Sequence, residues 1–226
     1  FNENAIINRL GFNNKGVDHL VQKLKKRKFS GVVGVNIGAN KESTGQDRIN
    51  DYLSCFRKVH EFCDYITVNI SSPNTPNLRD LHQSDNLIDL LNAIEGEIKK
   101  VNFVKPIFLK ISPDESRESL EFIIQAVDES GFSGLIATNT TIDKDNLQNS
   151  NYKELTGGLS GKPLMNKATK TIIDIKNISP NIGVIGVGGV MSREDFHEKL
   201  NSGACLVQIY TGFIIHGPKI VNELLK

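Results

Sequence analysis

The feature that most constrains the fold is a repeated pattern in which a short apolar run precedes a longer stretch with helical periodicity. The apolar runs are rich in β-branched residues and end in small or polar residues, which is typical of strands buried on both faces. They span residues 32–37, 65–70, 106–111, 134–138, 182–187 and 206–210. Helical patterns lie between them at residues 49–62, 87–100, 116–130, 166–178 and 193–202. This alternation predicts a parallel sheet covered by helices.

An open doubly wound sheet and a closed (β/α)8 barrel both fit this alternation. The ends of the predicted strands separate them, because an open sheet concentrates its site at one switch point, whereas a barrel collects a residue from each strand. Here every run ends in a chemically specific group: Asn36, Asn69, Lys110, Asn139, Gly188-Gly189 and Tyr210-Thr211. This favours the barrel.

A complete barrel has eight strands and about 250 residues, whereas this sequence of 226 residues begins at Phe1 without an initiator Met. We therefore expect an α/β chain that forms one (β/α)8 barrel domain over residues 1–226 but lacks the first strands. The stretch from Ile142 to Pro163 is expected to be its one long loop.

The composition excludes several classes of function. A formal net charge of +1 gives no basic surface for nucleic acid. The three cysteines, Cys55, Cys63 and Cys205, are expected to be buried thiols, since they form neither a CxxC pair nor a zinc spacing, and no metal site is predicted. No apolar run reaches the roughly 20 residues that span a bilayer. A small molecule is the expected partner.

Glycine and hydroxyl residues follow the last two predicted strands, in the runs 186–189 and 210–212, and recur at residues 158–162. In barrels, the loops after the seventh and eighth strands commonly bind phosphate through backbone N–H groups. Each run alone is also compatible with a tight turn. All three together indicate a phosphate site.

The remaining strand ends carry amides and one lysine. Asn36, Asn69, Asn74 and Asn139 can both donate and accept hydrogen bonds, as a pyrimidine or flavin edge requires, although a lone Asn at a strand end is often a turn former. Lys110 ends a buried strand and is expected to hold negative charge on a ligand, unless its side chain reaches solvent.

With these motifs in order along the chain, the sequence resembles the dihydroorotate dehydrogenases, flavoprotein barrels that oxidise dihydroorotate to orotate in pyrimidine synthesis. The resemblance runs nearly end to end. It rests on residues 7–14, 34–38, 68–75, 109–111, 138–141, 157–164, 186–189 and 208–211.

The resemblance also implies a class and a catalytic base. In this chain one loop reads Ser71-Ser72-Pro73-Asn74. Soluble members of the family carry Ser-Cys-Pro-Asn there, whereas quinone-linked, membrane-associated members carry Ser-Ser-Pro-Asn. Ser72 stands at the position of the cysteine. The resemblance therefore implies the quinone-linked class with Ser72 as the base, and Thr75 and Phe12 as a candidate proton relay. A turn or cap role for the serines is the alternative.

The remaining site residues follow from the same resemblance. Those that match the family's substrate contacts are Asn8, Asn69, Asn74, Asn139 and Thr140. Those that match its FMN contacts are Asn36, Asn69, Lys110, Ser160, Gly161, Gly188, Gly189, Tyr210 and Thr211.

The partners implied are dihydroorotate or orotate, FMN and a quinone, with no nucleic acid and no obligate protein partner. Location at the cytoplasmic side of a bacterial inner membrane is expected, through a peripheral segment outside this sequence. Two other functions stay open: a different FMN-dependent oxidoreductase, such as a dihydropyrimidine dehydrogenase or an alkene reductase, and a non-catalytic flavin- or phosphate-binding module.

Overall fold

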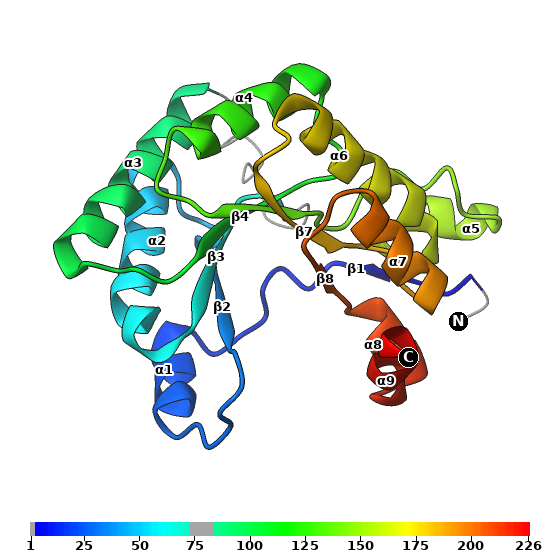
Figure 1. The fold of residues 1–226 in the computed structure, drawn as a ribbon, viewed down its shortest axis with the longest axis horizontal. Helices are drawn as coiled ribbons and strands as arrows, with labels where there is room; N and C mark the ends of the chain where they lie inside the picture. The colour runs from blue at the N-terminus through cyan, green and yellow to red at the C-terminus, as the bar shows by residue number, and fades with distance from the viewer. Residues whose placement is uncertain (1–2, 73–83) are drawn as a thin grey trace.

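A computed structural model describes residues 3–72 and 84–226, and its centre is a curved sheet of six parallel strands (Figure 1). The strand order is β2-β3-β4-β5-β7-β8, so within this sheet the strands follow one another in the order of the sequence. The strands are β2 (Gly34–Ile37), β3 (Tyr65–Asn69), β4 (Ile107–Ile111), β5 (Gly134–Ala137), β7 (Gly183–Val187) and β8 (Leu206–Gln208). Each lies within one of the six predicted apolar runs, which confirms them as strands.

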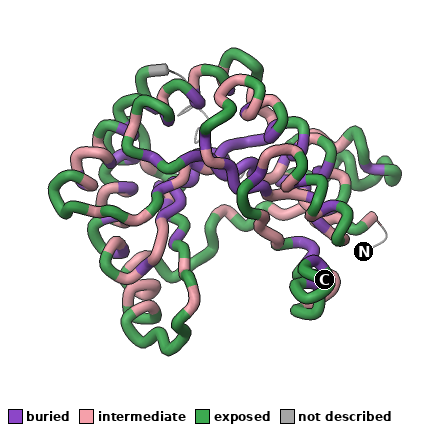
Figure 2. The backbone as a smooth tube through the Cα atoms, in the orientation of Figure 1, coloured by how far each residue is buried: buried purple, intermediate pink, exposed green. Residues whose placement is uncertain are grey.

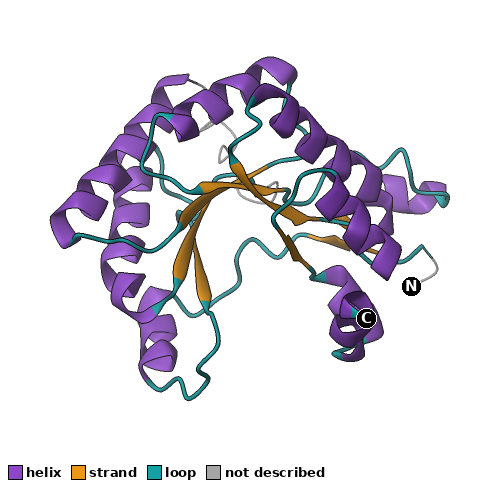
Figure 3. Cartoon of the chain, in the orientation of Figure 1, coloured by secondary structure: helices purple, strands orange, loops and turns teal. Residues whose placement is uncertain are grey.

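Helices cover the outer, convex side of this sheet (Figure 3). The predicted helical stretches correspond to α2 (Gly45–Val59) with a 3-10 turn (His60–Phe62), α3 (Ser84–Val101), α4 (Arg117–Asp128), α6 (Met165–Ile178) and α7 (Arg193–Asn201). Further elements are α1 (Val17–Lys25), α5 (Ser150–Lys153), the 3-10 turn Lys162–Leu164, α8 (Thr211–His216) and α9 (Lys219–Leu225).

The sheet is an open arc with the edges β2 and β8, which do not pair with each other. The chain between residues 9 and 16 crosses between these two edge strands (Figure 1). Six parallel strands in sequence order, with helices on their convex side (Figure 3), form a partial (β/α)8 barrel. The predicted fold class is confirmed.

A second, two-stranded sheet lies beside the arc. β1 (Ala5–Asn8) pairs antiparallel with β6 (Gly158–Gly161), so that Asn8 faces Gly158 and Ala5 faces Gly161. A bridge between Thr141 and Leu159 extends this sheet to the segment after β5. The interpretation of residues 142–163 as one loop was therefore wrong, because this stretch contains both α5 and β6.

The core lies between the sheet and its outer helices, as the buried positions in Figure 2 show. Tyr52 and Phe56 of α2 are fully enclosed, and so are Leu90 and Ile94 of α3. Burying one large apolar side chain contributes about 1.5–3 kcal/mol. This packing holds the sheet from outside and leaves the concave side for a site.

The structure also bears on the expected burial of the cysteines and on membrane-spanning helices. Cys63 is buried and Cys55 is half-buried, but Cys205 is exposed, so the expectation that all three are buried thiols was wrong for Cys205. Cys205 directly precedes the edge strand β8, whose outer side no described strand covers. Across residues 3–72 and 84–226, no helix has the length and apolarity that a membrane span needs.

Candidate active site

A cavity of about 420 Å³ lies where the carboxyl ends of the strands meet the β1–β6 sheet. Every predicted site residue within the described part of the chain lines it; Asn74 and Thr75 lie outside the described residues. These lining residues are Asn8, Phe12, Asn36, Asn69, Ser72, Lys110, Asn139, Thr140, Ser160, Gly161, Gly188, Gly189, Tyr210 and Thr211. Parallel strands therefore bring together residues that are up to 203 positions apart.

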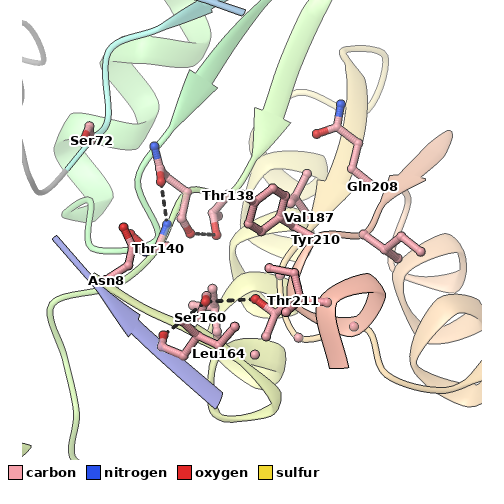
Figure 4. A pocket seen from close by; sticks show the side chains of 18 of the residues that line it. Asn8, Ser72, Thr138, Thr140, Ser160, Leu164, Val187, Gln208, Tyr210 and Thr211 are labelled. Carbon is pink, nitrogen blue, oxygen red and sulfur yellow. Dashed lines mark hydrogen bonds between the residues drawn. The ribbon is translucent and has the colours of Figure 1, made fainter. Parts of the chain in front are cut away.

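Ser72 and its neighbour Ser71 lie just past the end of β3, and their surroundings differ. Ser71 is fully buried, and its hydroxyl donates to the carbonyl oxygen of Lys110 at 2.8 Å. Ser72 is 6% exposed and lines the cavity, whereas Ser71 does not. Figure 4 shows Ser72 well apart from Tyr210, with Thr138 and Thr140 in between. Of the two serines, only Ser72 can meet a ligand in the cavity.

The amides of Asn69 and Asn139 form a network under the same end of the cavity. The side-chain nitrogen of Asn139 donates to Asn69 Oδ1 at 3.2 Å and to Ser71 Oγ at 3.1 Å. Asn139 Oδ1 in turn accepts from the backbone N–H of Thr140 at 2.8 Å. Asn69 Nδ2 donates to no described residue, which leaves its two N–H groups for a ligand.

Lys110 carries the only formal charge among the described residues that line the cavity. Its side chain extends from β4, and burial lowers the pKa of its ammonium group from the ordinary value. Within the described chain this ammonium group has no carboxylate or hydrogen-bond acceptor as partner. A half-buried cation without a partner costs free energy unless a ligand supplies negative charge or acceptors.

The opposite end of the cavity is built from glycines and hydroxyls. Gly161, Gly188 and Gly189 have φ values of 97°, 117° and 82°, which favour glycine. A Cβ atom at Gly189 would lie 2.4 Å from the Cα atom of Met165 at the start of α6. The hydroxyl of Thr211, the first residue of α8, donates to Ser160 Oγ at 2.9 Å (Figure 4). Backbone N–H groups and hydroxyls at such a place can hold a phosphate.

An ion pair between the half-exposed Lys162 and the buried Asp195 supports this glycine-rich end. Lys162 follows Gly161 and contacts Asp195 Oδ1 at 2.6 Å, while Asp195 Oδ2 accepts from the backbone N–H of Met191 at 3.0 Å. Asp195 therefore connects the loop after β6 to the loop after β7. The sequence interpretation assigned no role to this pair, because Lys162 and Asp195 are 33 residues apart and show no local motif.

The comparisons with known proteins agree with this geometry. A family model described as dihydroorotate dehydrogenase matches residues 1–226. This chain belongs to the dihydroorotate dehydrogenase family. The partial barrel, the strand-end amides and the glycine-rich loops are thus parts of a known enzyme scaffold.

Curated relatives agree on the class. The chain is 42% identical over 228 residues to the dihydroorotate dehydrogenase (quinone) of Legionella pneumophila strain Corby, covering 99% of this chain and 68% of that protein. It is 46% identical over 227 residues to the enzyme of that name from Shewanella sediminis, with 98% and 67% covered. The chain spans about two thirds of the length of these relatives, and the predicted resemblance to the quinone-linked class is confirmed.

Solved structures give the same result. The DHODH of Eimeria tenella in complex with ferulenol superposes with a TM-score of 0.92 at 33% identity, covering 99% of this chain and 66% of that one. The ligand-free type from the same organism also reaches 0.92, at 34% identity. The dihydroorotate dehydrogenase barrel is therefore retained over nearly all of this chain.

Several lining residues were not predicted from the sequence. Ile6, Leu164, Val187, Met191 and Gln208 form part of the cavity wall. Ile6 reaches it only because β1 pairs with β6, a contact between segments about 150 residues apart. The four apolar residues among them carry no chemical signal in the sequence, since most residues of their kind belong to the core.

Proposed function

We propose that this chain carries the active site of a quinone-dependent dihydroorotate dehydrogenase, which oxidises dihydroorotate to orotate in the synthesis of UMP. FMN is the hydride acceptor, a quinone is the final electron acceptor, and Ser72 is the catalytic base. The family model and the names of the curated relatives support the reaction. The roles of individual residues are argued from the cavity.

The observation that carries the assignment of Ser72 is the chemistry of the cavity wall. Among the described residues that line it, there is no Asp, Glu, His or Cys. This leaves the hydroxyl groups and Lys110 as candidate bases, and we assign Lys110 to the flavin. Of the hydroxyls, Ser72 lies apart from Ser160 and Thr211 at the proposed phosphate end (Figure 4). A flat substrate bound between Ser72 and that end would have its two faces addressed by different groups.

A serine hydroxyl is a weak base at neutral pH, so a path must remove its own proton. Phe12 lines the cavity and Thr75 follows three positions after Ser72 in the sequence; we assign both to ordering that path. The role of Thr75 rests on the family motif, since this residue lies outside the described part of the chain.

The amide end of the cavity suits the substrate. Asn8, Asn69, Asn139 and Thr140 line it, and the unused N–H groups of Asn69 can donate to a carboxylate or a carbonyl oxygen. Asn74 is assigned to the same group from the motif. Hydrogen bonds to fixed amides hold a reactant in a near-attack geometry.

The rest of the cavity suits FMN. The glycines at 161, 188 and 189, with the hydroxyls of Ser160 and Thr211, offer donors for a phosphate. Lys110, whose ammonium group no described residue pairs, lines the same cavity as Asn36 and Asn69. When bound, FMN supplies the hydride acceptor. Lys110, Asn36 and Tyr210 then hold and polarise it, and the substrate is held against it by the amides.

The test of the base is the pair Ser72→Ala and Ser72→Cys in FMN-loaded protein. Ser72→Ala should lower the rate of flavin bleaching by dihydroorotate by about 10²–10⁴-fold, the contribution typical of general base catalysis, with FMN still bound. Ser72→Cys should keep part of the activity with an altered pH profile, because a thiol ionises at lower pH. Substantial turnover in Ser72→Ala would sink the assignment.

Ser71→Ala is the matched control, because Ser71 is adjacent but does not line the cavity. It loosens the support of Asn139, so KM should rise, but flavin reduction at saturating substrate should stay within roughly tenfold of the wild-type rate. If Ser71→Ala lowered the rate of flavin reduction as much as Ser72→Ala does, the two serines could not be assigned different roles.

The quinone step is tested separately. Flavin reduced by dihydroorotate should be reoxidised by a soluble short-chain quinone analogue and not by NAD⁺. Because natural quinones reside in lipid, we assign the protein to the surface of the membrane, on the cytoplasmic side in a bacterium. Vesicles that contain quinone should then support turnover.

A further inference from the structure

Behind the substrate end of the cavity lies a charged network that does not line it. Asp114, after β4, has a side chain that is 11% exposed, and its Oδ1 contacts Lys167 Nζ of α6 at 2.7 Å. The hydroxyl of Thr141 donates to the same oxygen, and the backbone N–H of Ile142 donates to Oδ2 at 3.0 Å. This carboxylate thus meets donors from the end of the loop after β5.

That loop carries two residues assigned to the substrate, Asn139 and Thr140. On its near side, the backbone N–H of Asn139 donates to the carbonyl oxygen of Ile111 at 2.8 Å. On its far side, Thr141 exchanges backbone hydrogen bonds with Leu159 of β6, at 3.1 and 2.7 Å. The backbone is therefore held on both sides of Thr140, and the hydrogen bond from the Thr141 hydroxyl to Asp114 adds a side-chain contact at the far end of this loop.

We propose that Asp114 and Thr141 are positioning residues for the substrate: their hydrogen bond holds the loop after β5 so that Asn139 and Thr140 face the ligand. The inference rests on the proposed function. Asp114 and Thr141 contact neither substrate nor cofactor, because neither lines the cavity.

The charges around Asp114 favour this role. Burial opposes the ionised form, but Lys167, Thr141 and Ile142 together lower the pKa of the Asp114 carboxyl below its ordinary value. The carboxylate therefore stays ionised and accepts from all three at neutral pH. Thr141 is itself buried, with 3% of its surface exposed, so replacing its hydroxyl by a methyl group leaves the acceptor with one donor fewer.

A second carboxylate, that of Asp143, serves as a control for loss of the ion pair with Lys167. Asp143 also contacts Lys167, at 3.1 Å, but its side chain is 37% exposed. The carboxylate of Asp143 does not accept from Thr141; its backbone N–H donates to Thr141 Oγ1 at 3.0 Å, and a side-chain substitution retains that bond. Asp143→Asn therefore disturbs the ion pair without disturbing the side-chain contact proposed to matter.

The experiment compares Thr141→Val, Thr141→Ser, Asp114→Asn and Asp143→Asn in FMN-loaded protein. Orotate affinity is measured from the change in flavin absorbance, and KM and kcat are measured with dihydroorotate. Thr141→Val should weaken orotate binding and raise KM by about tenfold, a modest effect for a misplaced contact. Thr141→Ser keeps the hydroxyl, so its orotate affinity and KM should stay within about threefold of the wild-type values. The same is expected of Asp143→Asn. Asp114→Asn should resemble Thr141→Val.

FMN content and melting temperature separate positioning from general damage. A merely structural role lowers the melting temperature of Thr141→Val while orotate affinity stays at the wild-type level, and that result overturns the inference. Equal affinity of the Val and Ser variants overturns it too. If wild-type protein neither binds orotate nor is reduced by dihydroorotate, the proposed function fails instead, and the substrate named here fails with it.

Discussion

Lys199 of α7 is fully enclosed, and its replacement by methionine should stabilise the protein at pH 7. Its ammonium group donates to Thr169 Oγ1 at 2.8 Å and to the carbonyl oxygen of Met165 at 3.2 Å, both in the first turns of α6. Burial lowers its pKa from 10.5 to about 8, against the opposing effect of Glu198 and Asp195. At pH 7 the protein thus holds a charged lysine in its interior.

The size of the effect follows from the pKa. A tenfold change in an ionisation constant corresponds to about 1.4 kcal/mol, so keeping Lys199 charged costs about 3 kcal/mol of folding free energy at pH 7. Because the folded state binds this proton less tightly than the unfolded state does, stability rises as the pH increases from about 8 to 10.5. Methionine removes the charge but also the two hydrogen bonds, which together contribute about 1–2 kcal/mol.

Lys199→Met should therefore be more stable than wild type by about 1–2 kcal/mol at pH 7 and less stable by a similar amount above pH 10.5. Urea unfolding followed by circular dichroism at several pH values measures both, and the difference between the two proteins cancels the titration of groups that they share. A difference that is constant across this range would refute the reasoning, since it would mean that Lys199 does not titrate between the two states.

Two further substitutions test the cofactor end of the cavity. Lys110→Met should stabilise the FMN-free protein, because it removes a cation without a described partner. It should also weaken FMN binding by about ten- to a hundredfold, the loss expected for a hydrogen bond to a charged group. Unchanged FMN affinity in a fluorescence titration would contradict this prediction. Asp195→Asn removes the ion pair to Lys162 and should lower stability by about 1–3 kcal/mol and raise the fraction of FMN lost on dialysis. If only the melting temperature changes, Asp195 supports the fold but not the site.

The sheet could be predicted because each strand is buried on both faces, which concentrates Val, Ile and Leu in one short run. β6 could not be predicted from its residues, since Gly158–Gly161 contains two glycines, a residue type that is depleted in strands. It forms because β1 pairs with it from the other end of the chain. α1 was missed although Leu20, Val21 and Leu24 carry a helical spacing, because the pattern covers only Val17–Lys25.

The same distinction holds in the site. Asn36, Asn69 and Lys110 could be placed together because carboxyl ends of parallel strands meet at one end of a barrel. The residues that support this site could not be predicted. Asp114 reaches Thr141 only through the path of the loop after β5, and Asp195 reaches Lys162 only because α7 lies beside the turn after β6. Loop paths of this kind depend on tertiary contacts and not on local sequence.

The two halves of the cavity are held by different kinds of contact, and the difference fits their proposed tasks. The glycine-rich end is fixed by backbone conformation, by the Asp195–Lys162 pair and by the packing of Gly189 on Met165, which suits a cofactor that stays bound. The amide end is held by side-chain hydrogen bonds of 3.1–3.2 Å among Asn69, Ser71 and Asn139. Bonds of this length can be exchanged for bonds to a ligand at little free-energy difference. Substrate affinity should accordingly respond to mutation of the side chains that support the amide end, Asp114 among them, and cofactor affinity to mutation of Lys110 and Asp195.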